Sequence, residues 1–272
     1  MKISFIGGGN MAQALIGGLV MQDSEALQLH VVEPVESLRD VLQQKWSLST
    51  SPVVDAQCSG SDVIVLAVKP QQMQVAVAPL VAHLDGALVI SIAAGLRLAD
   101  LSRWLGGYSN IVRTMPNTPA LIAQGMTGLF APAAVSSEAR ELATRILSAI
   151  GRTVWVETEA QIDVITGISG SGPAYVFYFI EALESAGLAQ GLSPDVARTL
   201  AIQTCVGAAS LAAQSQDSPA KLRENVTSKG GTTAAALAVF EAQSWAQTVQ
   251  AAVQAAVLRG HALGEALGAE KE

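Results

Sequence analysis

The amino-acid sequence predicts an α/β domain with a parallel sheet, followed by an all-α domain. The chain has 272 residues, enough for about two domains that each bury a core. From Lys2 to about Val156, short β-rich runs alternate with helix-length amphipathic segments, as in a parallel sheet with crossover helices. From about Gln161 onward strand signals vanish and alanine-rich helix formers dominate. We therefore place the two domains at residues 1–158 and 159–272.

The elements of the first half follow one another in a regular order. Its strands are predicted from short runs of β-branched and apolar residues, at Ile3–Ile6, Leu29–Val32, Asp62–Val68, Ala87–Ile92, Asn110–Thr114 and Thr153–Val156. The helices between them are predicted from apolar residues at helical spacing, at Met11–Met21, Val35–Lys45, Gln71–Leu84, Leu98–Leu105 and Ser137–Ile150.

In the second half, two Ser-Pro pairs at residues 193–194 and 218–219 mark helix starts, because serine caps a helix and proline is tolerated in its first turn. The segments 164–180, 199–216 and 242–258 are apolar or small on most faces. A small helical domain cannot bury all of this surface, so we expect an obligate oligomer. The alternative is a helical domain that is simply rich in alanine.

The composition narrows the choice of partners. Half of the residues are hydrophobic and 14% are charged, which excludes a disordered chain. The net charge of −7 repels phosphate backbones and anionic lipid, so we expect a small-molecule substrate and no nucleic acid or membrane. Cys58 and Cys205 show no repeated spacing, which indicates two buried thiols in a reducing, cytoplasmic compartment.

The apolar run at the amino terminus, residues 2–21, imitates a secretory signal or a membrane span. Polar and glycine residues at positions 7–10 and 13 interrupt it, and no small-residue cleavage site follows. We expect neither a signal nor an anchor.

The clearest motif is the segment 6–12, I-G-G-G-N-M-A, which has the pattern G-x-G-x-x-A between the first strand and the first helix. Its glycines permit a tight turn and the close approach of a pyrophosphate, whose charge faces the helix N–H groups. The first domain is therefore predicted to be a Rossmann-type, dinucleotide-binding domain. The alternative is a glycine-rich turn without a ligand.

Glu33 follows the second strand, at the position that normally decides which nicotinamide cofactor is bound. A carboxylate there bonds the ribose hydroxyls and repels a 2′-phosphate, which favours NADH. The nearest cation, Arg39, lies one to two helical turns further along. The alternative is that the side chain of Glu33 points away and Pro34 merely ends the strand.

Two further segments follow buried strands, at residues 67–70 (A-V-K-P) and 93–95 (A-A-G). They fall at the carboxyl edge of the sheet, where open α/β folds bind ligands, and their small residues leave room for a cofactor. Lys69 either meets a phosphate or ends its strand as a solvated charge.

We expect no metal, because His30, His83 and His261 are far apart in the sequence and no cysteine pair has ligand spacing. The chain also lacks a G-x-S-x-G nucleophile elbow. Hydride transfer requires neither a metal nor a nucleophilic serine, since the nicotinamide carries the reactive hydrogen.

Three later segments go beyond a generic dinucleotide fold. They are residues 113–120 (R-T-M-P-N-T-P-A), 167–175 (G-I-S-G-S-G-P-A-Y) and 222–233 (L-R-E-N-V-T-S-K-G-G-T-T). Together and in this order they resemble pyrroline-5-carboxylate reductase, over nearly the whole chain. The resemblance implies an α/β Rossmann-type N-terminal domain followed by an all-α C-terminal dimerisation domain. It also implies NADPH- or NADH-dependent reduction of 1-pyrroline-5-carboxylate to L-proline, the last step of proline biosynthesis, by a homodimer that commonly assembles into a pentamer of dimers.

The resemblance also implies which residues bind the two ligands. Those that line the dinucleotide would be Ile6, Gly7, Gly8, Gly9, Asn10, Met11, Glu33, Pro34, Ala67, Val68, Lys69, Pro70, Ala93, Ala94, Gly95 and Asn225. Those that line the substrate would be Glu159, Ser228, Thr232 and Thr233.

The chain departs from the family pattern at two positions. Lys229 stands where the family most often has proline, and it either adds positive charge beside the substrate carboxylate or faces solvent. Glu33 stands where many members carry a small hydroxyl or neutral residue, so the sequence leaves the choice between NADPH and NADH open.

The turn at residues 228–233 precedes a helix predicted to start near Ala234, and its free backbone N–H groups suit an anion such as the substrate carboxylate. Thr233 is the candidate catalytic residue. Its hydroxyl is a poor acid, so it would orient the imine nitrogen, with the proton coming from water or an already protonated iminium. The alternative is a turn that only caps the helix.

Two other functions compete with this one. A β-hydroxyacid dehydrogenase shares the fold plan and aligns Gly167, Gly170 and Gly172, but Val176 stands at the position of its catalytic lysine and cannot transfer a proton. A dinucleotide-sensing oligomer would keep the cofactor cleft without chemistry.

Overall fold

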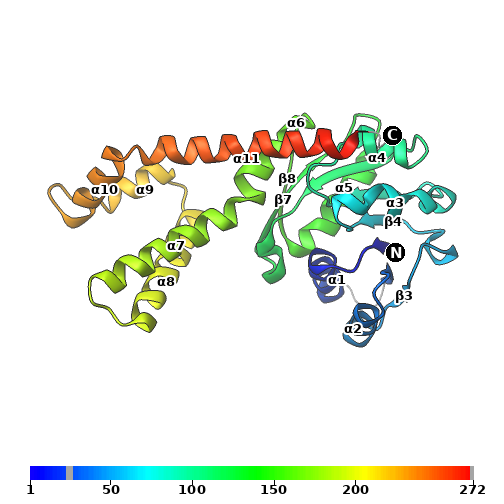
Figure 1. Cartoon of the computed structure of the whole chain (residues 1–272), viewed down its shortest axis with the longest axis horizontal. Helices are drawn as coiled ribbons and strands as arrows, with labels where there is room; N and C mark the ends of the chain where they lie inside the picture. The colour runs from blue at the N-terminus through cyan, green and yellow to red at the C-terminus, as the bar shows by residue number, and fades with distance from the viewer. Residues whose placement is uncertain (23–26, 270–272) are drawn as a thin grey trace. The chain divides into compact units, whose positions relative to one another are not determined.

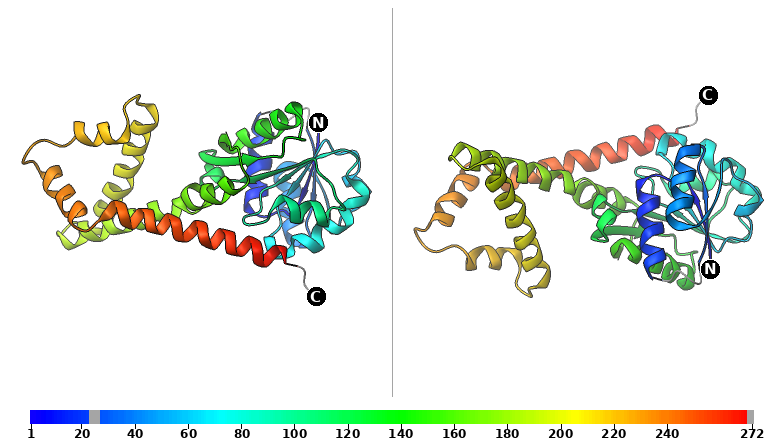
Figure 2. Two further views of the ribbon diagram at one scale, coloured as in Figure 1. Left: turned by 90° about the horizontal axis from the view of Figure 1, so that it is seen from above. Right: turned by 90° about the horizontal axis from the view of Figure 1, so that it is seen from below.

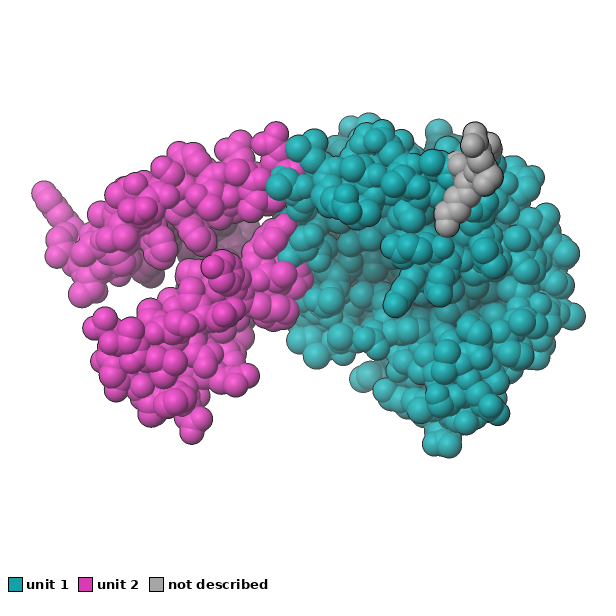
Figure 3. Space-filling model, viewed as in Figure 1, with its two compact units in different colours: residues 1–171, 255–272 teal, residues 172–254 magenta. Residues whose placement is uncertain are grey.

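The computed structural model describes residues 1–22 and 27–269 and forms two compact units (Figure 3). Unit 1 contains Met1–Ser171 and Ala255–Glu272, and unit 2 contains Gly172–Gln254. This division differs from the predicted boundary at residue 158, because helix α6 (Ala160–Ile165) packs against the sheet. The end of the last helix also joins unit 1, where Arg103 donates a hydrogen bond to the carbonyl of Gly268. The assignment of cofactor to one half and of substrate to the other stays a prediction.

Unit 1 is built on one eight-stranded sheet with the order β3-β2-β1-β4-β5-β6-β7-β8. Figure 1 labels β3, β4, β7 and β8 of this sheet. The strands are β1 (Lys2–Ile6), β2 (Gln28–Val32), β3 (Ser49–Ser51), β4 (Val63–Leu66), β5 (Leu88–Ser91), β6 (Ile111–Met115), β7 (Gly125–Phe130) and β8 (Gly151–Trp155). Neighbouring strands are parallel except β6 and β7, which are antiparallel. The strand order reverses at β1 and β4, which is where such sheets bind dinucleotides.

Strand β4 shows how the sheet is covered on both faces. Val63 and Val65 face one core with helices α1 (Asn10–Gln22), α2 (Glu36–Trp46) and α5 (Ser137–Leu147). Ile64 and Leu66 face the other core with α3 (Met73–Val77) and α4 (Leu98–Trp104). A strand buried on both faces is apolar throughout, which is the pattern that the sequence predicted. Figure 2 shows the sheet between these helical layers.

Two strands were not predicted, and each has a local reason. β3 is three polar residues long at the edge of the sheet. β7 contains Gly125 and Gly128, which β-propensity disfavours. A Cβ atom at Gly125 would lie 2.7 Å from the carbonyl oxygen of Ile150, and one at Gly128 would overlap the side chain of Ile165. The glycines are needed for close packing that local sequence does not reveal.

The helix predicted over residues 71–84 is broken into a 3₁₀ turn (Pro70–Gln72), the short helix α3, and a second 3₁₀ segment (Ala78–His83). Pro79 explains the break, because it lacks the N–H that an α-helix interior requires and its ring clashes with the preceding turn.

Unit 2 is helical, as predicted. It contains α7 (Gly172–Ala189), α8 (Pro194–Gln214), α9 (Pro219–Asn225), α10 (Thr232–Ala242) and the first part of α11 (Trp245–Gly268). Both predicted helix starts are confirmed at Pro194 and Pro219, and the hydroxyl of Ser218 accepts a hydrogen bond from Lys221 N.

Unit 2 buries little of its apolar surface within one protomer. Helices α7, α9 and α10 have no buried residue, and large side chains such as Phe177, Tyr178 and Val239 are more than 60% exposed. Among the described helices, α8 alone is long and apolar enough to cross a membrane, and only 11% of it is buried. Much of the apolar surface of unit 2 therefore stays exposed in the protomer.

The two cysteines differ in their surroundings. Both are free, but Cys58 is buried whereas Cys205 is only half-buried in the protomer. The prediction of two buried thiols is thus correct for Cys58 and wrong for Cys205 in the isolated protomer, because α8 lies at the surface of unit 2.

Candidate functional site

The carboxyl ends of four parallel strands meet at one edge of the sheet in unit 1. Gly7 N donates to Val32 O at 2.8 Å, and Ala67 N donates to Ile6 O at 2.8 Å. These two bonds tie the segments that follow β1, β2 and β4 together. The predicted cofactor residues of unit 1 follow β1, β2, β4 and β5 at this same edge.

Only glycine fits at the start of the turn after β1. Gly7 has φ +101°, and a Cβ atom there would lie 2.9 Å from the backbone of Ala67. At Gly9, by contrast, nothing lies within 4 Å of an added Cβ atom, so a ligand has room to approach. Helix α1 begins at Asn10, and the N–H groups of its first turn have no partner within the helix. Such a turn has the backbone geometry that can accept a pyrophosphate.

The side chain of Glu33 points at this turn and is 8% exposed. Its Oε2 accepts a hydrogen bond from Gly8 N at 2.9 Å, and its Oε1 accepts one from Val35 N at 3.0 Å. Arg39 Nη1 donates to the carbonyls of Glu33 and Pro34, each at 2.9 Å. The alternative in which the carboxylate points away from the glycine turn is therefore wrong.

The other predicted cofactor segments have contrasting exposure. Lys69 is exposed and precedes the 3₁₀ turn at Pro70, while Ala93 and Gly95 are buried after β5. Gly95 has φ +81°, and a Cβ atom at Gly264 of α11 would overlap its carbonyl oxygen. The β5–α4 loop is thus packed directly against the end of α11.

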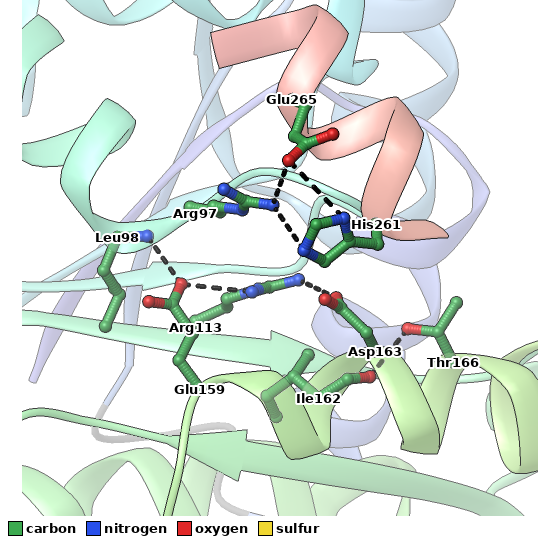
Figure 4. A network of polar contacts seen from close by, with 9 residues as sticks. All are labelled: Arg97, Leu98, Arg113, Glu159, Ile162, Asp163, Thr166, His261 and Glu265. Carbon is green, nitrogen blue, oxygen red and sulfur yellow. Dashed lines mark hydrogen bonds and ion pairs between the residues drawn. The ribbon is translucent and has the colours of Figure 1, made fainter. Parts of the chain in front are cut away.

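Glu159, predicted to line the substrate, belongs to a partly buried polar network in unit 1 (Figure 4). Its Oε1 accepts hydrogen bonds from Leu98 N at 2.7 Å and from Arg113 Nη1 at 3.1 Å. Arg113 Nη2 donates to Asp163 Oδ1 at 2.6 Å. The sequence analysis missed Arg113 and Asp163 as partners, although Arg113 opens the first of the family-like segments.

The remaining predicted residues lie in unit 2, around the start of α10. Gly230 has φ +72°, and the turn closes through a 3.0 Å hydrogen bond from Gly231 N to Ser228 O. Helix α10 begins at Thr232, two residues earlier than predicted, and no side chain caps it. The first-turn N–H groups of this 11-residue helix are therefore available to an anion. Asn225 ends α9 and donates to Asp217 at 3.4 Å.

One group of potential metal ligands exists among the described residues, formed by His30, Asp55 and Cys58, whose ligand atoms lie within 4.8 Å of one another. Both ring nitrogens of His30 already contact serine hydroxyls, at 2.9 Å to Ser49 and 3.1 Å to Ser51. Burial lowers the pKa of His30 and raises the pKa of the Cys58 thiol. A saturated imidazole and a neutral thiol describe a buried polar cluster better than a metal centre.

A cavity of about 680 Å³ lies within unit 2, and none of the predicted site residues is among those that line it. It is lined by Phe179, Arg223, Leu237, Phe240, Glu241, Trp245, Ala246 and Gln247. The rings of Phe179 and Phe240 pack against that of Trp245. Its apolar lining belongs to the surface of unit 2 that lacks cover.

The fold and the sheet edge define a Rossmann-type, dinucleotide-dependent oxidoreductase. Residues 2–95 match the family described as NADP oxidoreductase, coenzyme F420-dependent, and residues 159–263 match pyrroline-5-carboxylate reductase dimerisation. The chain belongs to the pyrroline-5-carboxylate reductase family. It is 43% identical to the reductase of Pseudomonas aeruginosa over 98% of each chain, and 46% identical to that of Haemophilus influenzae over 92% and 93%.

Solved structures agree with this membership. The chain is similar to a pyrroline-5-carboxylate reductase from Coxiella burnetii, with a TM-score of 0.91, 39% identity and coverage of 96% and 97% of the two chains. It is also similar to the Plasmodium falciparum enzyme with NADP bound, with a TM-score of 0.84, 31% identity and coverage of 97% and 98%.

Proposed function

We propose that this protein reduces 1-pyrroline-5-carboxylate to L-proline with a hydride from a nicotinamide dinucleotide. The observation that carries the proposal is the combination, in one chain, of a glycine turn suited to a pyrophosphate and a second, uncapped helix start suited to a carboxylate. The reaction adds a hydride to the imine carbon, and the ring nitrogen ends with a proton.

The residues of unit 1 suit the dinucleotide. The open space beside Gly9 admits the pyrophosphate, and the absence of side chains at Gly7 and Gly8 lets the turn pack closely on Ala67 and Leu42. When bound, the dinucleotide supplies the hydride, and the segments 67–70 and 93–95 would hold its nicotinamide half. Exposed Lys69 is available to a phosphate.

We propose NADH as the preferred cofactor. The carboxylate of Glu33 is fixed beside the glycine turn by Gly8 N and Val35 N. A fixed negative charge there accepts hydrogen bonds from ribose hydroxyls and repels a 2′-phosphate. Arg39 is the cation nearest to this corner in sequence, and one of its nitrogens is bound to the carbonyls of Glu33 and Pro34.

In unit 2, the substrate carboxylate would bind the free N–H groups at the start of α10, with the hydroxyls of Ser228 and Thr232 as further donors. Thr233 lies one residue further into the helix and makes no cap bond, so its hydroxyl remains available to orient the imine nitrogen. Since a threonine hydroxyl is a weak acid, the proton comes from water or is already on the iminium.

We also propose that the protein is a homodimer, with a pentamer of dimers as the larger assembly that the family resemblance implies. Exposed Phe177, Tyr178 and Val239 supply the apolar surface for the contact. The same contact would cover the exposed apolar residues of α8. A subunit interface therefore explains the apolar character of this helix better than a membrane span does. The free thiols of Cys58 and Cys205 support a cytoplasmic location.

The test is the oxidation of NADH or NADPH by the purified protein, followed at 340 nm with and without the imine. Oxidation that depends on 1-pyrroline-5-carboxylate and yields L-proline supports the proposal. Tight cofactor binding without turnover would contradict it and favour a dinucleotide sensor. Oxidation of a β-hydroxyacid with NAD⁺ or NADP⁺ as the hydride acceptor would favour the dehydrogenase, although Val176 provides no proton-transferring group for that route.

A further inference from the structure

The β5–α4 loop, residues 92–97, is held from two sides within unit 1 (Figure 4). On one side, Glu159 Oε1 accepts the N–H of Leu98, the first residue of α4, at 2.7 Å. On the other side, Arg97 Nη2 lies 3.1 Å from His261 Nε2 and 3.8 Å from Glu265 on α11. Gly264 of α11 lies directly on the carbonyl of Gly95. The loop therefore sits between α6 and α11.

Arg113 donates to the same carboxylate oxygen of Glu159 that accepts the N–H of Leu98. It is 2% exposed, and its two terminal nitrogens donate to Glu159 at 3.1 Å and Asp163 at 2.6 Å. A buried guanidinium is fixed in direction by two such bonds, because its donors have a rigid planar geometry. Its Nε is buried without a hydrogen-bond partner.

We propose that Arg113 is a positioning residue, which acts through Glu159 on the β5–α4 loop and thereby sets the place of the nicotinamide ring. This inference rests on the proposed function, in which Ala93, Ala94 and Gly95 line the dinucleotide. Strand β5 lies on the far side of β4 from β1, so its loop would contact the nicotinamide half rather than the adenosine half. Gly264 acts on the same loop from α11, independently of Arg113.

Two matched pairs of variants test the proposal. Arg113→Met removes the donor to Glu159, and its control is Arg140→Met, whose guanidinium donates to the carbonyls of Ala131, Pro132 and Val135. Gly264→Ala puts a methyl group onto the carbonyl of Gly95. Its control is Gly260→Ala, one turn earlier on α11, where an added Cβ atom meets nothing within 4 Å.

Three measurements separate positioning from stability in the full-length protein. They are kcat with saturating cofactor and imine, the fluorescence of bound NADH, and the Kd of ADP-ribose, which lacks the nicotinamide. Arg113→Met and Gly264→Ala should each lower kcat at least tenfold and change the NADH emission, because a small displacement of reacting groups is costly. The Kd of ADP-ribose should stay within twofold of wild type, and both controls should keep wild-type kcat.

The proposal is overturned if the test variants match their controls in kcat and NADH emission, or if ADP-ribose binding weakens in step with NADH binding. Should Arg113→Met fail to fold, Arg113→Lys replaces it, because lysine keeps the positive charge and lacks the fixed pair of donors to Glu159 and Asp163. If wild-type protein does not reduce the imine, the proposed function fails. The fluorescence of bound NADH and the Kd of ADP-ribose would still show whether the β5–α4 loop positions the nicotinamide.

Discussion

The charge of Glu33 should set the cofactor preference, and Glu33→Gln tests this with little change in shape. The carboxylate is 8% exposed and accepts hydrogen bonds from Gly8 N and Val35 N. Glutamine removes the negative charge and keeps one acceptor oxygen, so one of the two N–H donors loses its partner. Glu33→Ser removes both acceptors as well, and each buried N–H left unpaired costs about 1–3 kcal/mol of stability.

The expected size of the effect follows from Coulomb's law. With a 2′-phosphate about 6 Å from the carboxylate and an effective dielectric constant of about 20, the repulsion is about 332/(20 × 6), or about 2.8 kcal/mol per unit charge. Because the phosphate side of the corner is open to solvent, we expect about 1–3 kcal/mol. This corresponds to roughly a 5- to 150-fold shift in the ratio of kcat/KM for NADPH to that for NADH.

The assay is a set of steady-state rates with both cofactors at saturating imine, for wild type, Glu33→Gln and Glu33→Ser. Both variants should shift toward NADPH, and the melting temperature should fall further in Glu33→Ser, which leaves both N–H donors unpaired, than in Glu33→Gln, which leaves one. An unchanged cofactor ratio in Glu33→Gln would refute the reasoning, since it would mean that the ribose does not lie beside this carboxylate.

Three further predictions follow from other parts of the molecule. Thr233→Ala should lower kcat by roughly ten- to a hundredfold and leave the cofactor Kd near wild type. The melting temperature should also stay near wild type, because no side chain caps α10. Normal turnover with a lower melting temperature would instead mean that this hydroxyl stabilises the helix. Burial lowers the pKa of His30 in the folded protein below the ordinary value of 6.5. As the pH drops, the imidazole is therefore protonated in the unfolded chain before it is protonated in the folded one. The free energy of unfolding falls as the pH drops from about 6.5 through the lowered pKa. The melting temperature of His30→Gln should therefore decline less over that window, and equal slopes in both proteins would speak against a neutral buried imidazole. Light scattering of dilute protein should give at least a dimer, because α7, α9 and α10 bury no residue in the protomer, whereas a fully active monomer of 28.1 kDa would contradict the proposed interface.

The sequence by itself determined the elements whose signals are local. The strands at the centre of the sheet could be predicted because a doubly covered strand such as β4 is apolar throughout. The starts of α8 and α9 could be predicted because Ser-Pro pairs act within one helical turn. The glycine turn at residues 7–9 belongs to the same class, since its pattern lies between a strand and a helix.

Tertiary structure alone decided the features that depend on distant neighbours. Whether Glu33 faces the glycine turn depends on a hydrogen bond to Gly8, 25 residues away, and strand-end position does not fix the direction of a side chain. Strand β7 was missed because its glycines are explained by Ile150 and Ile165, which approach only in the folded chain. Arg113 lies 46 and 50 residues from Glu159 and Asp163. Local spacing reports which face of an element is apolar, whereas the partner of a buried charge is set by which elements the fold brings side by side.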